Sequence, residues 1–384
     1  MKALTFHGKH NIQHESVKDP IIEQATDVIV RERIAGLCGS DLHVYHERER
    51  GLDHGTVMGH EFVGEIVEVG RRVSKLRKGD VVFSPFTTSC GRCFYCRANL
   101  TCRCTSGQLF GWRQGGIGLH GGQAEFVRVP LADSTLLKTP DGLGLETALM
   151  LGDILSTGYF CADMAQVSPG GTYAVVGCGP VGLCAVLSAI ELGAERVYAL
   201  DTISERLQLA ERFGAMPIAV HNENAVALIR SVTDGRGADA VLEVVGNPGA
   251  TRLAVDLVRP GGIISTVGVH NEAEFAFSPV EAYDKNLTFK IGRCPARYYM
   301  ERLIPLAQKR AGDLLQIISH RLPLSAGPRA YEIFDQKKEN CTKVILMPDS
   351  EASLTTKGTK NTKEKQLRRL ASDFPLITQL LLPT

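Results

Sequence analysis

The chain has 384 residues, of which 44% are hydrophobic and 22% charged, and its mean hydropathy is −0.02. At about 150 residues per domain this length favours two domains, and the composition is typical of a globular protein with a large core. The 43 Lys and Arg residues and 42 Asp and Glu residues leave a formal charge of +1, so nucleic acid is not expected as a main partner.

The chain has no apolar run near the roughly 20 residues of a membrane-spanning helix, and its first residues lack the apolar core of a signal peptide. We therefore expect a cytoplasmic protein with no membrane partner. Its eleven cysteines are then expected to act as metal ligands or free thiols rather than to form disulfides.

The first 150 residues mix short β-like runs with glycine-rich loops, and strands are expected at 28–33, 61–69, 80–83 and 124–129. From Thr172 onward, apolar strands alternate with helical stretches. The expected strands are 172–176, 196–201, 239–245, 262–267 and 287–291, and the expected helices are 181–192, 204–213 and 225–232. This alternation predicts an α/β domain with a parallel sheet wrapped by helices. A helix at 297–307 and a strand at 342–347 end the globular part, and 349–384 form a tail of unknown role.

Five cysteines fall within fifteen residues, and four of them have the spacing C-x2-C-x2-C-x7-C: Cys90, Cys93, Cys96 and Cys104. Four thiolates this close in sequence can close a tetrahedral shell around Zn²⁺ without an open position, which indicates a structural site. Cys102 is an alternative to Cys104 as the fourth ligand. An iron–sulfur cluster or a set of unrelated thiols is the alternative to zinc.

A G-x-G-x-x-G pattern lies between an expected strand and an expected helix, in Gly177-Cys178-Gly179-Pro180-Val181-Gly182. In that context the glycines let the backbone approach a dinucleotide pyrophosphate at the helix N-terminus. We expect Gly177, Gly179, Val181 and Gly182 to bind it. A glycine turn without a ligand is the alternative.

Asp201 lies nineteen positions after Gly182, at the end of the next expected strand, where its carboxylate can accept hydrogen bonds from an adenosine ribose. Its negative charge would repel a 2′-phosphate, so NAD is favoured over NADP. Arg206 could attract that phosphate, which leaves NADP as the alternative.

Cys38 and His60 supply a thiol and an imidazole, both good zinc ligands, outside the cysteine-rich segment. Residue type alone does not decide their role, because a buried cysteine is usually a core residue and a single histidine is usually a satisfied polar group.

The run Gly59-His60-Glu61-Phe62-Val63-Gly64, continuing to Gly70 and Val73, resembles the signature of the zinc-containing alcohol dehydrogenases of the medium-chain dehydrogenase/reductase superfamily. The four cysteines and the glycine pattern follow in the order of that family, and the resemblance covers residues 1–348. It implies a catalytic domain with a GroES-like irregular β-barrel at 1–154, including a zinc lobe at 90–104. A doubly wound Rossmann domain at 155–294 would be inserted before the chain returns to the catalytic domain at 295–348.

The resemblance also implies a catalytic zinc held by Cys38, His60 and a third ligand four residues before a Thr-Gly pair. That position is Asp153 in this chain, where many family members have cysteine. The aspartate is similar to the glutathione-independent formaldehyde dehydrogenase branch, and three protein ligands leave a fourth position open for water or substrate. If Asp153 merely caps the next helix, Glu61 is the expected replacement ligand.

Further site residues follow from the same resemblance. Glu61 is expected near the zinc, where it can approach the metal during ligand exchange, and Asp41 is expected to orient His60. Ser40 and His43 match the positions that relay the substrate proton through the cofactor ribose to the surface. From residue type alone, Ser40 also fits a turn and His43 an exposed histidine.

These observations predict an enzyme with two zinc ions that transfers a hydride between NAD and an alcohol or aldehyde hydrate. Its expected partners are a small-molecule substrate and further copies of the chain, in a dimer or tetramer. An aldehyde dismutase that retains its NAD(H) is the alternative, followed by a non-catalytic NAD-binding protein. Five aromatic residues could line an apolar pocket or belong to the core: Tyr45, Phe83, Phe86, Phe110 and Trp112.

Overall fold

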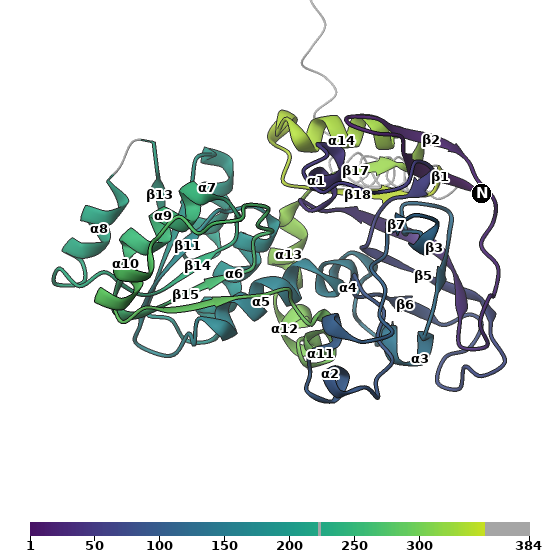
Figure 1. Ribbon diagram of the computed structural model, residues 1–384, viewed down its shortest axis with the longest axis horizontal. Helices are drawn as coiled ribbons and strands as arrows, with labels where there is room; N and C mark the ends of the chain where they lie inside the picture. Colours follow the sequence, from purple (N-terminus) through teal and green to yellow (C-terminus); the bar gives the residue numbers. More distant parts are fainter. Residues whose placement is uncertain (222–223, 350–384) are drawn as a thin grey trace, which may run out of the picture.

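Residues 1–221 and 224–349 are described by a computed structural model of the chain. Two lobes lie next to each other, one built of mostly antiparallel strands and the other of parallel strands flanked by helices (Figure 1). The predicted fold class is confirmed, because a doubly wound parallel sheet interrupts a domain of antiparallel β structure.

The antiparallel lobe, called the β domain below, contains both the first and the last strands of the described chain. Its seven-stranded sheet has the order β10-β6-β5-β3-β18-β17, with β9 also paired to β3, and it is joined by a three-stranded sheet of order β2-β1-β4 and a β7-β8 hairpin. The strands are β1 (Lys2–Phe6), β2 (Ile12–Ser16), β3 (Val28–Leu37), β4 (Thr56–Val57), β5 (Phe62–Val69), β6 (Val81–Phe83), β7 (Trp112–Gln114), β8 (Ile117–Leu119), β9 (Phe126–Val129), β10 (Leu137–Lys138), β17 (Ile318–Pro323) and β18 (Lys343–Met347).

Short helices connect these strands. They are α1 (Asp41–Tyr45), α2 (Phe94–Arg97), α3 (Ala132–Thr135) and α14 (Gly327–Asp335), with 3-10 turns η1 (Thr101–Arg103), η2 (Leu324–Ala326) and η3 (Lys338–Asn340). β18 pairs antiparallel with β3 and parallel with β17, so residues from both ends of the described chain meet in the middle of one sheet.

The second lobe is a six-stranded parallel sheet of order β13-β12-β11-β14-β15-β16. Its strands are β11 (Thr172–Val176), β12 (Arg196–Asp201), β13 (Met216–Ala219), β14 (Ala238–Glu243), β15 (Val258–Thr266) and β16 (Thr288–Ile291), and its helices are α6 (Pro180–Glu191), α7 (Ser204–Arg212), α8 (Ala225–Ser231), α9 (Pro248–Leu257) and α10 (Pro279–Asp284). The strand order reverses between β11 and β14, and ligands of such sheets bind at this point, outside the carboxyl ends of the strands.

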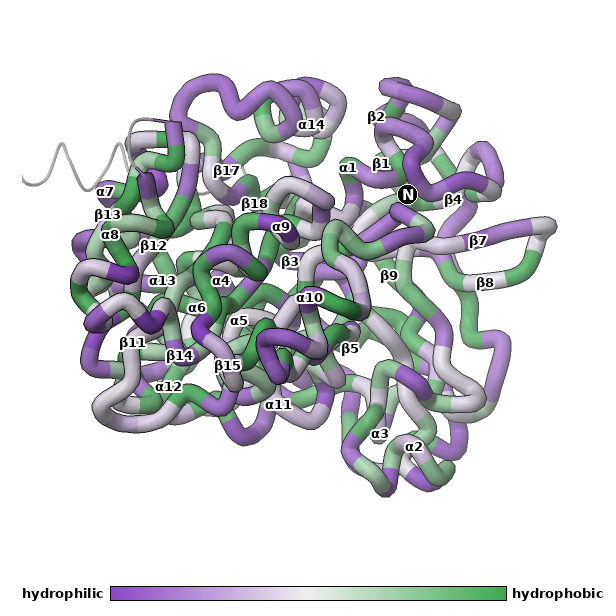
Figure 2. The backbone as a smooth tube through the Cα atoms, turned by 60° about the vertical axis from the view of Figure 1, so that its left-hand side comes forward, coloured by the Kyte–Doolittle hydropathy of each residue, from purple (hydrophilic) through white to green (hydrophobic). Residues whose placement is uncertain are grey.

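Five helices lie at the junction of the lobes: α4 (Leu145–Gly152), α5 (Ile154–Met164), α11 (Ala296–Arg302), α12 (Ile304–Lys309) and α13 (Ala311–Ile317). The largest apolar cluster crosses this junction, from Phe83 of the β domain through Leu151 of α4 to Leu183 of α6. Apolar stretches are visible along α5, α6 and the parallel strands (Figure 2). The two lobes are therefore packed together by burial of apolar side chains, the main favourable term in folding.

The pattern-based prediction was accurate for the parallel sheet and poorer elsewhere. Strands 172–176 and 196–201 match β11 and β12, whereas the single helix predicted at 297–307 is wrong, because it is divided into α11 and α12. Pro305 explains the division, since proline lacks the N–H that would continue the first helix. The strand predicted at 262–267 begins earlier, at Val258.

Two expectations concern regions beyond these elements. None of the helices in the described part of the chain combines the length and apolar character that crossing a lipid bilayer requires. The predicted tail lies outside the described residues except for Asp349, whose carboxylate accepts a hydrogen bond from the Ser325 hydroxyl at 2.7 Å.

Candidate active site

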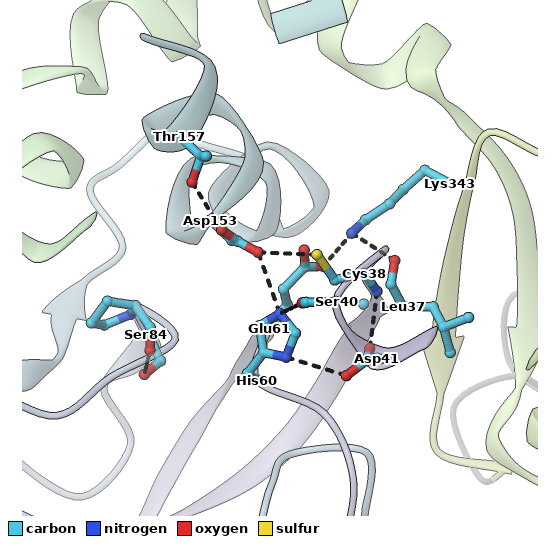
Figure 3. Close-up of polar contacts among 12 residues, drawn as sticks. Leu37, Cys38, Ser40, Asp41, His60, Glu61, Ser84, Asp153, Thr157 and Lys343 are labelled. Carbon is cyan, nitrogen blue, oxygen red and sulfur yellow. Dashed lines mark hydrogen bonds and ion pairs between the residues drawn. The ribbon is translucent and has the colours of Figure 1, made fainter. Parts of the chain in front are cut away.

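Within the described residues the structure brings together two groups of potential metal ligands, and one of them consists of Cys38, His60, Glu61 and Asp153. Cys38 directly follows β3, His60 and Glu61 directly precede β5, and Asp153 separates α4 from α5. One ligand atom from each residue lies within 4.8 Å of the others. His60, Glu61 and Asp153 are buried, and Cys38 is half-buried. Side chains distant in sequence thus converge on one point (Figure 3).

The His60 ring is oriented by Asp41. Asp41 Oδ1 lies 3.2 Å from His60 Nδ1, while the other carboxylate oxygen accepts from the Cys38 backbone N–H at 3.0 Å and from Gln123 Nε2 at 3.3 Å. The second ring nitrogen, Nε2, therefore faces the cluster and lies 3.4 Å from Asp153 Oδ2. Burial alone would lower the pKa of His60, but the Asp41 and Asp153 carboxylates raise that pKa well above its usual value.

Asp153 faces the cluster rather than the backbone of the next helix. It stands at the break between α4 and α5 with φ −137° and ψ −73°, and within the described chain its side chain makes no capping hydrogen bond. Oδ2 accepts from the Cys38 thiol at 3.5 Å, and Oδ1 accepts from the Thr157 hydroxyl at 3.1 Å. Burial raises the pKa of Asp153, but the hydrogen bond and charge of His60, together with Glu61 and Lys343, outweigh burial and hold that pKa below its usual range.

Sequence reasoning missed Lys343, which is fully buried beside Glu61. Its ammonium donates to Glu61 Oε2 and to the Leu37 carbonyl, the latter at 2.9 Å. Burial would lower the pKa of Lys343, yet the Glu61 carboxylate raises it, so Lys343 carries its charge at neutral pH. A lysine inside the apolar run 342–347 was the available signal, because a buried lysine requires a partner.

The donor set fits a zinc ion. A thiol, an imidazole nitrogen and a carboxylate oxygen are the ligand types that Zn²⁺ accepts, and three of them suit a catalytic site with an open position. Glu61 Oε1 is buried and has no hydrogen-bond partner among the described residues. Such a carboxylate oxygen suits either ligation or the approach expected of Glu61.

Ser40 and His43 have different hydrogen-bond partners. Ser40 Oγ is 3.2 Å from His60 Nε2, which places its hydroxyl beside the cluster. His43 is in α1, where its Nδ1 accepts a hydrogen bond from Asn271 Nδ2 of the parallel-sheet lobe at 2.7 Å. Burial lowers the pKa of His43, with further contributions from Arg48 and His46 that Glu272 opposes.

The second group of potential metal ligands is formed by Cys90, Cys93, Cys96 and Cys104, whose sulfur atoms lie within 4.8 Å of one another. Backbone N–H groups of the same loop point at these sulfurs, from Cys93 to Cys90 at 3.4 Å and from Cys90 to Cys104 at 3.2 Å. Backbone N–H donation, above all from Cys96, lowers the pKa of Cys93 to about 6.

Cys102 is directed away from this group. Its thiol donates to the Arg293 carbonyl at 3.3 Å, and η1, which carries it, packs against α11. The structure therefore brings Cys104, and not Cys102, together with Cys90, Cys93 and Cys96.

The glycine pattern forms the turn between β11 and α6. Gly177 has φ +95°, a backbone conformation that favours glycine, and a Cβ on Gly182 would lie 1.8 Å from the Gly177 carbonyl oxygen. Gly179 precedes Pro180, the first residue of the helix, and Val181 packs against the main apolar cluster. The turn therefore has the close strand-to-helix approach that a pyrophosphate site requires.

Asp201 lies at the carboxyl end of β12, beside this turn, and its carboxylate is already engaged. Oδ2 accepts from the Cys178 N–H at 2.6 Å, and Oδ1 accepts from the N–H groups of Thr202 at 2.7 Å and Ile203 at 2.9 Å. A carboxylate offers about four acceptor sites, so capacity for a ribose hydroxyl remains.

Arg206 extends over the glycine turn. Its NH1 would lie 3.8 Å from a Cβ built on Gly179, and its Nε is buried without a hydrogen-bond partner among the described residues.

The five aromatic residues differ in their surroundings. Phe86 places its ring edge against the His60 ring, at 6.4 Å between centroids, whereas Phe110 packs on Phe62 and Tyr45 on Tyr331. Phe83 is buried in the main apolar cluster and Trp112 is partly buried against another. Within the described chain, Phe86 alone of these five has a ring contact with one of the four potential metal ligands, His60.

Comparison with known proteins gives consistent results. Residues 24–141 match the model of the alcohol dehydrogenase GroES-like domain, and residues 180–309 match that of a zinc-binding dehydrogenase. The chain is 41% identical over 350 residues to zinc-type alcohol dehydrogenase B of Aspergillus flavus, covering 88% of this chain and 79% of that protein.

Two further relatives extend this similarity. NADP-dependent isopropanol dehydrogenase of Thermoanaerobacter brockii is 35% identical over 301 residues, covering 77% of this chain and 84% of that protein. The solved structure of alcohol dehydrogenase TADH from Thermus sp. ATN1 matches with a TM-score of 0.84 and 41% identity, covering 91% of this chain and 100% of that one.

Proposed function

Because the chain belongs to the zinc-type alcohol dehydrogenases of the medium-chain dehydrogenase/reductase superfamily, we propose that it interconverts an alcohol and its carbonyl product with NAD, at Cys38, His60 and Asp153. The observation that carries this proposal is the convergence of these three ligand types with Glu61, whose ligand atoms lie within 4.8 Å of one another at a largely buried position. That the chain is an oxidoreductase follows from the family itself.

The protein residues have separate tasks in this reaction. A Zn²⁺ ion bound by the three ligands would lower the pKa of the substrate hydroxyl, and bound NAD would accept the hydride. Asp41 holds His60 Nε2 toward the cluster, and Thr157 holds the Asp153 carboxylate. The Ser40 hydroxyl, next to His60 Nε2, accepts the substrate proton, and His43 passes it toward solvent.

The choice of NAD rests on Asp201. Its carboxylate, fixed by three backbone N–H groups at the end of β12, places a negative charge where the 2′-phosphate of NADP would lie. The relative from Thermoanaerobacter brockii is named as NADP-dependent, so cofactor choice differs within the family. Arg206, over the glycine turn, is in reach of the pyrophosphate and is proposed to bind it together with the Gly177, Gly179, Val181 and Gly182 turn.

We propose a second, structural zinc at Cys90, Cys93, Cys96 and Cys104, which gives two zinc ions per chain. Support comes from the four converging sulfurs and from the backbone N–H groups that donate to the sulfurs of Cys90 and Cys104. Both zinc sites need reduced thiols, and the eleven cysteines are unpaired in the structure, which supports a cytoplasmic location.

The edge of the parallel sheet supports the proposal that the protein forms a homo-oligomer. β16 is an edge strand, and no strand of the described chain pairs with its outer side. Exposed apolar side chains lie on β16 and on the segment before it: Phe275, Val280, Tyr283 and Ile291. An unpaired edge with such side chains favours pairing with a second copy.

The proposed domain boundaries remain at 154/155 and 294/295, with the tail from 349. The return of the chain to the β domain through β17 and β18 supports the second boundary. The formaldehyde dehydrogenase branch rests on Asp153 alone, and none of the relatives described above carries that name. No specific observation favours the aldehyde dismutase or the non-catalytic alternative.

The proposal is tested by assaying purified protein, with its zinc counted, against a panel of primary and secondary alcohols and aldehydes with NAD and with NADP. We expect two zinc ions per chain, turnover that requires added cofactor, and higher kcat/KM with NAD. Turnover of aldehyde without added cofactor would instead favour the dismutase. Full zinc content without turnover of any substrate would contradict the proposed activity.

A further inference from the structure

A side-chain hydrogen bond joins the two lobes outside the metal-ligand cluster. Asn271 Nδ2 donates to His43 Nδ1 at 2.7 Å, across 228 positions of sequence. Asn271 lies in the segment between β15 and α10 of the parallel-sheet lobe, and His43 lies in α1 of the β domain. Through this contact, the parallel-sheet lobe touches a residue of the proposed proton relay.

The segment that carries Asn271 is firmly held at its base. The backbones of Gly246 and Gly268 cross so closely that a Cβ on Gly268 would lie 2.2 Å from the Gly246 nitrogen. Glu243, fully buried at the end of β14, accepts from the Gly246 N–H at 2.8 Å and lies 3.3 Å from His270 Nε2. The residue next to Asn271 is therefore tied to the strand ends of the sheet.

His43 is equally well anchored on the other side. Its backbone carbonyl accepts from the N–H groups of Arg48 at 2.8 Å and Glu49 at 3.3 Å, and its own N–H donates to the Ser40 carbonyl at 3.1 Å. With both ends fixed, the hydrogen bond determines which nitrogen of the half-buried His43 ring carries the proton. Nδ1 accepts from the amide, so the proton of the neutral ring lies on Nε2.

We propose that Asn271 is a positioning residue that holds His43 in place and in its Nε2–H tautomer; this inference rests on the relay role proposed for His43. A carboxamide suits this task because it has a donor and an acceptor on one rotating group. A proton added to His43 must bind Nδ1, so the Asn271 amide first turns its NH2 group away from Nδ1 and then accepts from the new N–H with its Oδ1. The same residue thus holds the ring in both protonation states.

The first test is a double-mutant cycle between the two residues. Asn271→Ala should lower kcat about three- to tenfold with little change in KM, as expected for loss of one neutral hydrogen bond. In a His43→Gln background the same change should have no further effect, because the two residues act as one unit. Glu274→Ala, an exposed change on the same segment, is the matched control and should leave kcat unchanged.

The outcomes separate this inference from the proposed function. If His43→Gln leaves kcat unchanged, the relay fails and the role of Asn271 fails with it. If His43→Gln lowers kcat but Asn271→Ala has equal effects in both backgrounds, the relay stands and the positioning role is overturned.

The second test needs no turnover. Nitrogen-15 NMR of the His43 ring, assigned by the signals lost in His43→Gln, should show the Nε2–H tautomer in the wild-type protein and a mixture in Asn271→Ala. Asn271→Asp should raise the pKa of His43 by about one unit, because a carboxylate favours the imidazolium. Arg48, His46 and Glu272 also face the ring and stay unchanged in this comparison. An unchanged tautomer in Asn271→Ala and an unchanged pKa in Asn271→Asp would overturn the proposal.

Discussion

The two clusters of potential metal ligands are built in different ways. Cys90 and Cys104, the outermost residues of the four-cysteine cluster, are 14 positions apart, whereas Cys38 and Asp153 of the other cluster are 115 positions apart. The first is a local loop whose sulfurs accept from its own backbone. The second is buried and requires β3, β5, the α4–α5 junction and β18 to be in place. A short-range cluster can thus be deduced from the spacing of its residues in the sequence. A long-range cluster can be found only once the fold that brings its residues together is known.

The largest expected effect is on the long-range cluster. Lys343→Met removes the cation that faces the buried Glu61 carboxylate, which should lower the free energy of unfolding by about 3–5 kcal/mol. Urea denaturation measures this. The double variant with Glu61→Leu should recover most of the loss, because no buried charge is then left unpaired. Equal instability of the single and double variants would show that the ion pair is not the cause.

Asp153→Asn should reduce kcat about a hundredfold, because a neutral amide is a poorer zinc ligand than a carboxylate. One of two zinc ions should be lost under mild chelation, while the four-cysteine zinc is retained. Steady-state kinetics and elemental analysis provide the measurement. Glu146→Gln, which removes a partly exposed carboxylate paired with Arg321, is the control. Retention of both metals and of wild-type rates would remove Asp153 from the ligand set and favour Glu61.

Cys93→Ser should affect stability more than chemistry, since it opens the short-range cluster. We expect loss of one zinc and a fall in Tm of about 5–10 °C, with turnover measurable below the new Tm. Cys102→Ser is the matched control, because its hydroxyl can still donate to the Arg293 carbonyl. A Tm equal in both variants would mean that the four-cysteine cluster does not stabilise the fold.

The glycine turn and Asp201 form an arrangement intermediate between these two clusters, because the glycines lie in one segment and Asp201 on the following strand. Asp201→Asn should raise the ratio of kcat/KM with NADP to that with NAD about tenfold, by removing a negative charge near the 2′-position. Glu205→Gln, an exposed change nearby, should leave the ratio unchanged. An unchanged ratio in Asp201→Asn as well would remove Asp201 from cofactor selection.

The parallel sheet was predictable because burial on both faces gives continuous apolar runs such as Thr172–Val176, bounded by glycine. The two-residue and three-residue strands of the β domain, such as Thr56–Val57, carry too few residues for a periodic signal. The helix at 297–307 was wrongly continued through Pro305, although proline is a direct signal of a break.

The candidate site divides in the same way. Residue types and spacing identified the four cysteines and the glycine turn, while resemblance to a family was needed for Cys38, His60 and Asp153. Asn271 was beyond prediction, because its role depends on a contact over 228 positions. The burial of Lys343 could have been suspected, because it is a charged residue at the start of an apolar strand. No pattern in the sequence connects it with Glu61.

The position of β18 has a consequence for how the chain is made. Because β18 is the last strand of the described chain and lies between β3 and β17, the β sheet stays incomplete during most of synthesis. The parallel-sheet lobe is one continuous segment and is free to fold as it leaves the ribosome, as domains generally do. Until Lys343 has been translated, the Glu61 carboxylate has no cation to pair with. The surroundings of the proposed catalytic cluster are therefore completed late, and a chain that ends before residue 343 lacks the Lys343 partner of Glu61.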